Sequence, residues 1–288
     1  MNKITRTIIL FFAALLIFTS CSSQPKSQGD IFDLRIQAET LLESGNSEAA
    51  KGNFENALIL LNESMRRAIL ADDPSLLIRC SLSRGNVLFS LGHTDEAFLE
   101  WEHAVTEAQK IRNSELLAIS RIYHARGMLV SGRDSARSVL DIVNREQGNI
   151  KSKNAQLYTA FTWQVRGLAL RAMGSYTEAE AAVRRSLQIH EKGKYLENAS
   201  YDWYTIASIR SLSGNTAGAL AALESSIALD RRVENSWGLA ASWRAMGDVY
   251  SKSGRTPEAR EAYIRAITIY AAMGNDYEVL ETERRMNL

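Results

Sequence analysis

Cysteine and proline are both scarce in this chain. Two of its 288 residues are cysteine and three are proline, whereas 45% are hydrophobic. Two cysteines allow at most one disulfide bond, and so few prolines leave long stretches uninterrupted for helices. With alanine and leucine prominent among the apolar residues, this composition predicts a soluble, nearly all-helical protein with a substantial core.

Neither sign of charge is in excess. Lysine and arginine together number 34, and aspartate and glutamate number 33. This balance excludes a global electrostatic field that would attract nucleic acid or anionic membranes. Arginine outnumbers lysine among the basic residues, which favours directional contacts with carboxylates over diffuse charge.

Sequence motifs of catalysis are also missing. The chain has no G-x-S-x-G elbow, no Walker loop and no G-x-G-x-x-G after a strand. Its histidines show no H-x3-H or Cys/His pairing of the kind that binds metals, so we expect them to be scattered on the surface. They are His93, His103, His124 and His190. We therefore expect a protein that is not an enzyme and uses no metal or other cofactor.

The longest apolar run lies near the N-terminus. Residues 8–18 are wholly apolar, follow Lys3 and Arg6, and precede the small pair "TS". This is the layout of a secretory signal peptide. A membrane-spanning helix needs ~20 apolar residues, so we expect the run to be removed rather than kept as an anchor. The prediction is a signal peptide over residues 1–20.

Cys21 follows this run directly. "FTSC" resembles a bacterial lipobox, in which the cysteine is acylated and becomes the first residue of the mature chain, although Phe18 stands where Leu, Val or Ile is usual. A Cys21–Cys80 disulfide is the alternative. Cys80, however, lies in an apolar helical stretch, where a free cysteine behaves as a small core residue. We predict lipidation at Cys21 and a flexible tether over residues 21–30.

A repeat of about 40 residues covers most of the chain. Six segments align on Gly52, Gly92, Gly132, Gly174, Gly214 and Gly254, at spacings of 40, 40, 42, 40 and 40 residues. After each glycine, apolar residues recur at spacings of four and three, as in Ala259, Tyr263 and Ala266, which places them on one helix face. Another helical pattern precedes each glycine. The repeating unit is therefore helix, short glycine turn, helix.

The stretch "WRAMGDVY" from Trp243 resembles the tetratricopeptide signature W-x2-L-G-x2-Y, which continues as A-x3-F. The resemblance implies an all-α, right-handed superhelical solenoid of about six repeats over residues 31–275, capped by a helix over 276–288. Two features depart from the family: the repeat has about 40 residues instead of 34, and only Pro74 stands near the usual terminal proline. Longer repeats occur in subfamilies that bind extended peptides, such as those similar to kinesin light chain.

Several repeat residues have a structural explanation. We expect Gly167 and Gly247 to let two helices approach closely, with Ala57 and Ala259 doing the same from the partner helix and tryptophans filling the space between. The third repeat is shorter and is followed by the polar segment "NREQGNIKSKNAQ", which predicts a loosely packed joint between two halves.

The resemblance also suggests a function. Tetratricopeptide lipoproteins of Gram-negative bacteria serve as adaptors in envelope complexes, so we expect a membrane-anchored cell-envelope lipoprotein that binds a protein or peptide partner and no nucleic acid. Ser22 after the cysteine favours the outer membrane, facing the periplasm or the surface. The alternative is a solute- or ligand-binding envelope lipoprotein that partners a transporter. A closed, water-filled tunnel would favour this alternative, and an open groove the adaptor.

The partner-binding surface is predicted from the family's habit of lining its concave groove with the first helix of each repeat. Residues spaced three, four and seven apart that the Trp/Gly packing leaves free form this stripe. They are Arg79, Leu82, Asn86, Phe89, Phe161, Gln164, Leu168, Arg171, Tyr201, Tyr204, Ser208, Arg244 and Asp248. Leu42 and Leu82 stand where a carboxylate clamp needs lysine, so no such clamp is expected. We expect an extended peptide across the fourth to sixth repeats, with arginines pairing with its acidic groups.

Overall fold

The computed structural model of the chain describes residues 30–152 and 155–287, and these form thirteen α-helices with no strand. In chain order the helices are α2 (Asp30–Ala50), α3 (Phe54–Leu70), α4 (Pro74–Ser90), α5 (Thr94–Lys110), α6 (Ser114–Val130), α7 (Ala136–Glu146), α8 (Gln156–Ala172), α9 (Tyr176–Gly193), α10 (Leu196–Leu212), α11 (Thr216–Arg232), α12 (Ser236–Lys252), α13 (Thr256–Ala272) and α14 (Asp276–Met286). The predicted all-α solenoid of helix-turn-helix repeats is confirmed. The predicted signal peptide and Cys21 lie outside the described residues.

Short turns join the helices into antiparallel pairs. All six repeat glycines, from Gly52 to Gly254, adopt left-handed φ angles between 70° and 85°. Residues with a Cβ rarely adopt this conformation, which ends one helix and redirects the chain into the next. Several of the turns between repeats carry an N-cap residue for the helix that follows. The side chain of Asn235, before α12, accepts a hydrogen bond from the backbone N–H of Gly238 at 2.9 Å.

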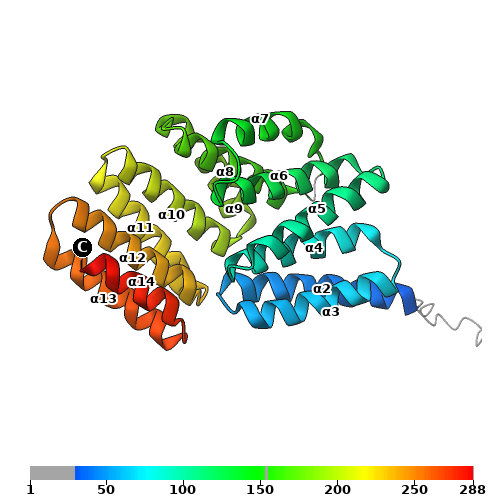
Figure 1. Ribbon diagram of the computed structural model, residues 1–288, viewed down its shortest axis with the longest axis horizontal. Helices are drawn as coiled ribbons and strands as arrows, with labels where there is room; N and C mark the ends of the chain where they lie inside the picture. The colour runs from blue at the N-terminus through cyan, green and yellow to red at the C-terminus, as the bar shows by residue number, and fades with distance from the viewer. Residues whose placement is uncertain (1–29, 153–154, 288) are drawn as a thin grey trace, which may run out of the picture.

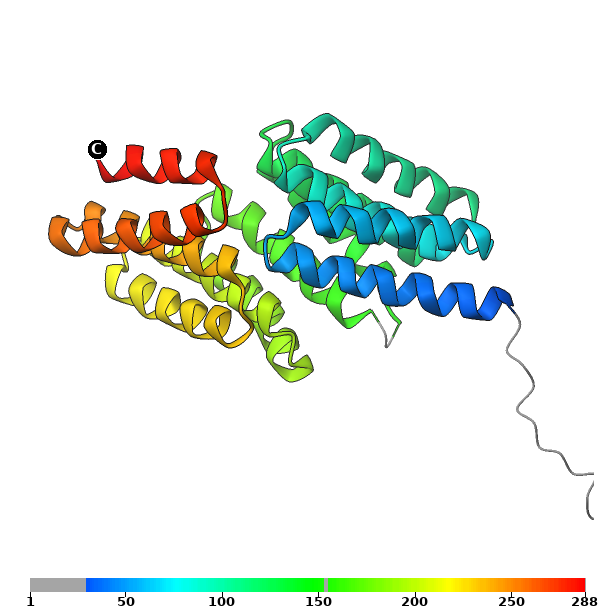
Figure 2. The ribbon, with the colours of Figure 1, turned by 90° about the horizontal axis from the view of Figure 1, so that it is seen from below.

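The pairs stack in chain order into a curved solenoid (Figures 1 and 2). Consecutive first helices contact one another along the whole series, from α2 with α4 to α12 with α14. The first helices therefore form the inner layer of the curve, and the second helices of each pair form the outer layer. Within the described residues, no helix has the length and apolar character to cross a membrane.

Glycines allow the two layers to approach closely, as predicted. A Cβ on Gly247 would lie 2.6 Å from the Tyr263 ring, and one on Gly167 would lie 2.4 Å from Val183. These separations are too short for real Cβ contacts, so any larger residue must displace its neighbour. The tryptophans only partly match their predicted role. Trp101 is fully buried, whereas Trp163 is half-buried, with the Arg185 guanidinium 4.4 Å from its ring centroid.

The third repeat is short, as predicted, and the described part of the polar segment after it is anchored at several points. Its second helix, α7, is followed by a 3-10 turn at Gln147–Asn149. Glu115 on α6 accepts hydrogen bonds from the backbone N–H groups of Lys151 and Ser152, each at 2.9 Å. Glu146, which is 2% exposed, is ion-paired with Arg121 at 2.9 Å. The polar segment is thus held by charge-assisted hydrogen bonds on both sides.

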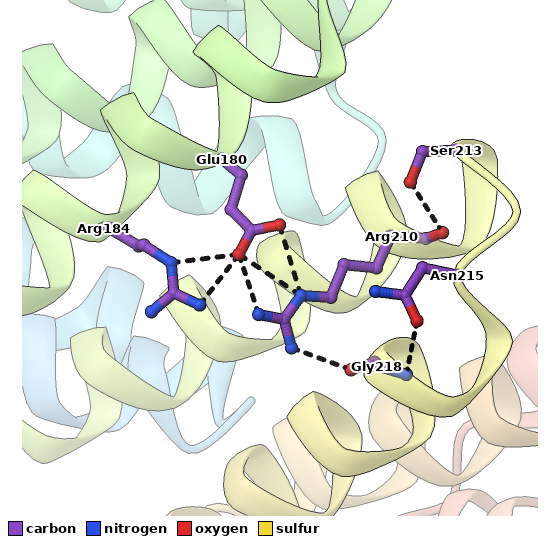
Figure 3. Close-up of polar contacts among 6 residues, drawn as sticks. All are labelled: Glu180, Arg184, Arg210, Ser213, Asn215 and Gly218. Carbon is purple, nitrogen blue, oxygen red and sulfur yellow. Dashed lines mark hydrogen bonds and ion pairs between the residues drawn. The ribbon is translucent and has the colours of Figure 1, made fainter.

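A polar contact also joins the fourth and fifth repeats (Figure 3). Arg210 on α10 donates hydrogen bonds to Glu180 on α9 at 2.8 Å and to the Gly218 carbonyl on α11 at 3.0 Å. The Arg210 hydrogen bonds, followed by those of Arg184, hold the pKa of the Glu180 carboxyl below its usual value. One guanidinium therefore links three successive helices and fixes the relative position of two repeats.

Candidate partner-binding surface

Four residues of the predicted stripe gather on the inner layer of the last three repeats. Arg171 lies on α8, Tyr204 on α10, and Arg244 and Asp248 on α12. All four side chains are partly exposed. We call these residues the arginine–tyrosine cluster, together with five neighbours that contact or surround them. The neighbours are Ser208, Tyr263, Tyr270, Glu278 and Arg285.

Hydrogen bonds within the cluster join α8 to α10, and α12 to both α13 and α14. Arg171 Nη1 donates to Ser208 Oγ at 3.0 Å, which joins α8 to α10. Asp248 on α12 accepts hydrogen bonds from Tyr263 Oη at 2.9 Å and from Arg285 Nη1 at 2.8 Å. The cluster is therefore a preorganised polar surface rather than a set of independent exposed side chains.

Arg244 has the most enclosed position in the cluster. Its side chain is 17% exposed, is ion-paired with Glu278 on α14, and has its guanidinium 5.5 Å from the ring centroid of Tyr270. Burial disfavours the charged guanidinium and lowers its pKa. Electrostatic interactions with Tyr270 and Glu278 have a larger combined effect, so the pKa of Arg244 is raised overall. Arg244 is consequently a fixed positive charge against an aromatic wall.

The cluster has more hydrogen-bond donors than acceptors. Arg171 has no carboxylate partner within the described residues, and the buried hydroxyl of Tyr270 has no hydrogen-bond partner there. Burial raises the pKa of the hydroxyls of Tyr204 and Tyr270, so both remain protonated donors at neutral pH. Arg244 and Arg285 are each paired with carboxylates, and Arg171 is the arginine of the cluster that has none within the described residues. The chemistry of the cluster suits an acceptor-rich, negatively charged group.

The inner layer of the N-terminal repeats is filled by the chain's own aromatic side chains. Phe161 stacks on Tyr123 with ring centroids 4.2 Å apart. Tyr158 packs against the core of α4 to α6, where burial raises the pKa of its hydroxyl and the charge of Arg79 partly opposes that rise. Phe89 packs on Trp101 at 5.7 Å.

The other predicted residues lie beside or outside the cluster. Tyr201 is 39% exposed and stacks on Tyr204. Asn86 on α4 is half-buried, and its Oδ1 has no hydrogen-bond partner among the described residues. Leu82 and Leu168 belong to the core, at 2% and 5% exposed, and not to the inner surface. Partner binding by the stripe remains a prediction.

Gln164 lies in the interior and not in the groove. It is 6% exposed and donates a hydrogen bond to Asp202 at 3.0 Å. His190 shares the same carboxylate, with 2.6 Å between its Nδ1 and Asp202 Oδ2. The prediction of surface histidines is therefore wrong for His190, because a buried carboxylate on the next helix provides its partner. Cys80, by contrast, is the buried free thiol expected, and its Sγ lies 3.1 Å from Ser64 Oγ.

Sequence reasoning missed Tyr270, Glu278 and Arg285. The repeat period offered one signal: His190, Asp230 and Tyr270 follow one another at intervals of 40 residues, and all three are buried. Glu278 and Arg285 gave no comparable signal, because polar residues are expected on a capping helix that faces water.

Other kinds of site were sought across the described residues. They contain no group of three or more His, Cys, Asp or Glu side chains arranged to bind a metal. A cavity of about 340 Å³ lies between α11 and α13, with Trp243 and Tyr250 of α12 in its wall and Glu224, Glu258 and Glu261 around it. None of the cluster residues lines this cavity.

Tetratricopeptide-repeat family models match two stretches of the chain, residues 166–192 and residues 197–272. These stretches include most of the last three repeats, where the arginine–tyrosine cluster lies. No curated protein matches the chain significantly.

Several solved structures share the fold. A Rap protein complexed with Competence and Sporulation Factor aligns with a TM-score of 0.60 at 12% identity, over 87% of this chain and 73% of that chain. BtubC from P. vanneervenii aligns with a TM-score of 0.53 at 16% identity, over 84% and 92%. A putative kinesin light chain from Podosopora anserina aligns with a TM-score of 0.51 at 19% identity, over 70% and 97%. At these identities the similarity concerns the fold alone.

Proposed function

We propose that the chain is a membrane-anchored envelope lipoprotein that binds an extended, acidic segment of a partner protein at the arginine–tyrosine cluster. In this role it acts as an adaptor or assembly scaffold. The observation that carries the proposal is the position of Arg171, which is partly exposed on the inner layer and has no carboxylate partner within the described residues.

The side chains of the cluster suit a peptide better than a small solute. Arginine and tyrosine dominate the hot spots of protein interfaces because they combine large contact area with hydrogen bonding. Arg171 and Arg244 lie on helices of different repeats, so their ligand must extend along the solenoid. Because arginine favours paired contacts with planar carboxylates, acidic side chains are the expected anchors of the segment.

The fold comparison supports the same role. The Rap structure, which shares this fold over most of the chain, was solved in complex with Competence and Sporulation Factor. The charged start, the apolar run and Cys21 support a lipid anchor that would hold the solenoid at a bacterial envelope membrane, with the outer membrane favoured. Such a location gives the solenoid access to proteins of the envelope.

The alternative role, a solute-binding lipoprotein that partners a transporter, has less support. It calls for a chamber within the superhelix, whereas the cavity of about 340 Å³ is lined by α11, α12 and α13 and includes none of the cluster residues. Its wall also includes Arg231, whose guanidinium lies 5.9 Å from the centroid of the Trp243 ring in the same wall.

Site-specific photo-crosslinking in intact envelopes tests the proposed function. A benzophenone side chain would replace Tyr204 in the cluster or, as the matched control, Leu99, which is 65% exposed on the outer helix α5. We expect a covalent adduct from position 204 that position 99 does not form, and we expect Arg171→Ala to reduce its yield. Equal yields from the two positions, or an adduct insensitive to Arg171→Ala, would show that the partner binds elsewhere.

A further inference from the structure

The first and sixth repeats touch, although they are far apart in the sequence. The ring of Phe54, at the start of α3, meets the ring of Trp237, at the start of α12, edge to face with centroids 5.2 Å apart. In Figure 1 the turn between α2 and α3 lies beside the start of α12. The solenoid therefore curves far enough for its two ends to meet.

The Gly52 turn is fitted against the sixth repeat. A Cβ on Gly52 would lie 2.7 Å from Trp237 Cβ and 3.1 Å from Met273 Cε. At the five equivalent glycines, a Cβ would have no neighbour within 4 Å. All six glycines have the same left-handed backbone, so backbone geometry does not explain the difference. Among the six turn glycines, Gly52 is the one whose close contact with another repeat also leaves no room for a Cβ.

Aromatic contacts connect this meeting point to the arginine–tyrosine cluster. Trp237 packs edge to face on Tyr270, with centroids 5.7 Å apart. Tyr270 is fully buried, and its ring lies beside the Arg244 guanidinium. The side chains of Phe54, Trp237, Tyr270 and Arg244 thus form an unbroken series of contacts from the first repeat to the candidate site.

We propose that Gly52, Phe54, Trp237 and Met273 form a latch that closes the superhelix, and that an acidic group bound at Arg244 stabilises the closed latch through Tyr270. The ligand part of this inference rests on the proposed function. The contact involves few side chains, so the free-energy difference between the closed and open states is small. A ligand that binds one state more tightly can therefore shift the equilibrium between them. Tyr270 is fully buried, so the bound group would act through the Arg244 guanidinium, which lies against the Tyr270 ring that packs on Trp237.

The latch also restricts the kind of partner. While the ends are in contact, a linear segment can lie along the inner layer more readily than a folded domain, which would have to fit between the two ends. Coupling between two sites is reciprocal. If an acidic segment favours the closed latch, then closing the latch must tighten binding of the segment by the same factor.

Distance measurements on the full chain test the latch without any ligand. Spin labels attached to unnatural residues at Glu55 and Ser236, both exposed, report the separation of the two ends. We expect Gly52→Ala to lengthen and broaden this distance distribution. Gly92→Ala is the matched control, because it carries the same left-handed strain and has open space around it. Identical distributions in the two variants would overturn the latch.

A second arm tests coupling to the site. The probe is a pool of random peptides that carry glutamate, compared with a pool in which lysine replaces glutamate. We expect the glutamate pool to narrow the distribution of distances between the two labels in the native chain. We also expect this pool to bind Gly52→Ala several-fold more weakly than it binds Gly92→Ala. Tyr270→Leu, which removes the ring that links Arg244 to Trp237, should lose the narrowing, whereas Tyr270→Phe should retain it. If the glutamate pool binds without narrowing the distribution, the coupling is wrong. If neither pool binds, the proposed function is wrong. The comparison of Gly52→Ala with Gly92→Ala without ligand still tests whether the latch exists.

Discussion

Arg244 on α12 is ion-paired with Glu278 on α14, so the last helix of the chain supplies the counter-charge for an arginine of the inner surface. Both side chains are less than one-fifth exposed. A partner carboxylate that approaches Arg244 must therefore compete with a carboxylate that the chain itself provides, and α14 both caps the solenoid and moderates the candidate site.

Removal of this competitor should strengthen binding of acidic peptides. Glu278→Gln keeps the size of the side chain and abolishes its charge, so we expect the Kd of the glutamate peptide pool to fall roughly fivefold, a change of about 1 kcal/mol. Fluorescence anisotropy with labelled peptides measures the change. Glu283→Gln on the same helix is the control, because no ion pair joins Glu283 to Arg244. Unchanged or weaker binding in Glu278→Gln would mean that Glu278 does not occupy the ligand's position.

The buried carboxyl of Asp230 predicts a pH dependence of stability. Asp230 is 1% exposed, accepts a hydrogen bond from Asn235 at 2.8 Å, and has its pKa raised by burial to about 6. Because the folded state binds this proton more tightly, the group contributes stability that is fully present below its unfolded pKa of about 3.9 and is lost as pH rises through 6. We expect Asp230→Asn to be more stable at pH 7 by about 1–3 kcal/mol.

Urea unfolding between pH 4 and pH 7 measures this effect. The stability of the native chain relative to Asp230→Asn should decline over that interval, while the exposed-site control Asp141→Asn should follow the native chain throughout. Parallel pH profiles for the native chain and Asp230→Asn would contradict the account.

Close helix packing at Gly247 should make this position intolerant of bulk. Because a Cβ there would lie 2.6 Å from the Tyr263 ring, Gly247→Leu should destabilise the fold by about 1–3 kcal/mol through overpacking. Repeats couple mainly to their neighbours, so hydrogen exchange should rise in α12 to α14 and stay unchanged in α4 and α5. Ala221→Leu, at an exposed position of α11, should alter neither. An equal rise in every repeat would be inconsistent with this local coupling.

The predicted anchor can be tested with the two cysteines. Cys21→Ala should release the chain into the soluble fraction, because acyl chains on this residue are the proposed membrane attachment. Cys80→Ala is the matched control: its thiol is fully buried, so its loss should leave membrane association intact. Retention of Cys21→Ala at the native level after membrane fractionation would exclude lipid anchoring at this position.

The solenoid could be predicted from the sequence because its determinants are local and repeated. Glycines at regular intervals and small residues such as Gly247 and Ala259 mark every turn and every close approach, so one repeat supports the interpretation of the others. The burial of individual tryptophans could not be predicted in this way. The helical pattern alone assigns Trp163 to the core, but it is half-buried, and the Arg185 side chain covers one face of its ring.

The candidate site was only partly predictable, because its partners come from different repeats. Helix periodicity placed Arg171, Tyr204 and Arg244 on one stripe, but it also placed Gln164 there, which instead donates to the buried Asp202. Whether such a side chain turns toward the groove or the adjacent helix depends on the residue opposite. Contact between the two ends of the solenoid depends on the accumulated curvature of six repeats, which no single repeat encodes.

The most direct measurement of the central claim is the effect of Arg171→Ala on the affinity for the glutamate peptide pool. Arg171 has no carboxylate partner within the described residues, so its removal leaves no intramolecular charge unpaired. Arg232→Ala, at an exposed position of the outer helix α11, serves as the control. We expect Arg171→Ala to weaken binding by about 1–2 kcal/mol, roughly a five- to thirtyfold rise in Kd, with helix content and melting unchanged. Equal affinities for Arg171→Ala and Arg232→Ala would contradict the assignment of the arginine–tyrosine cluster as the binding site.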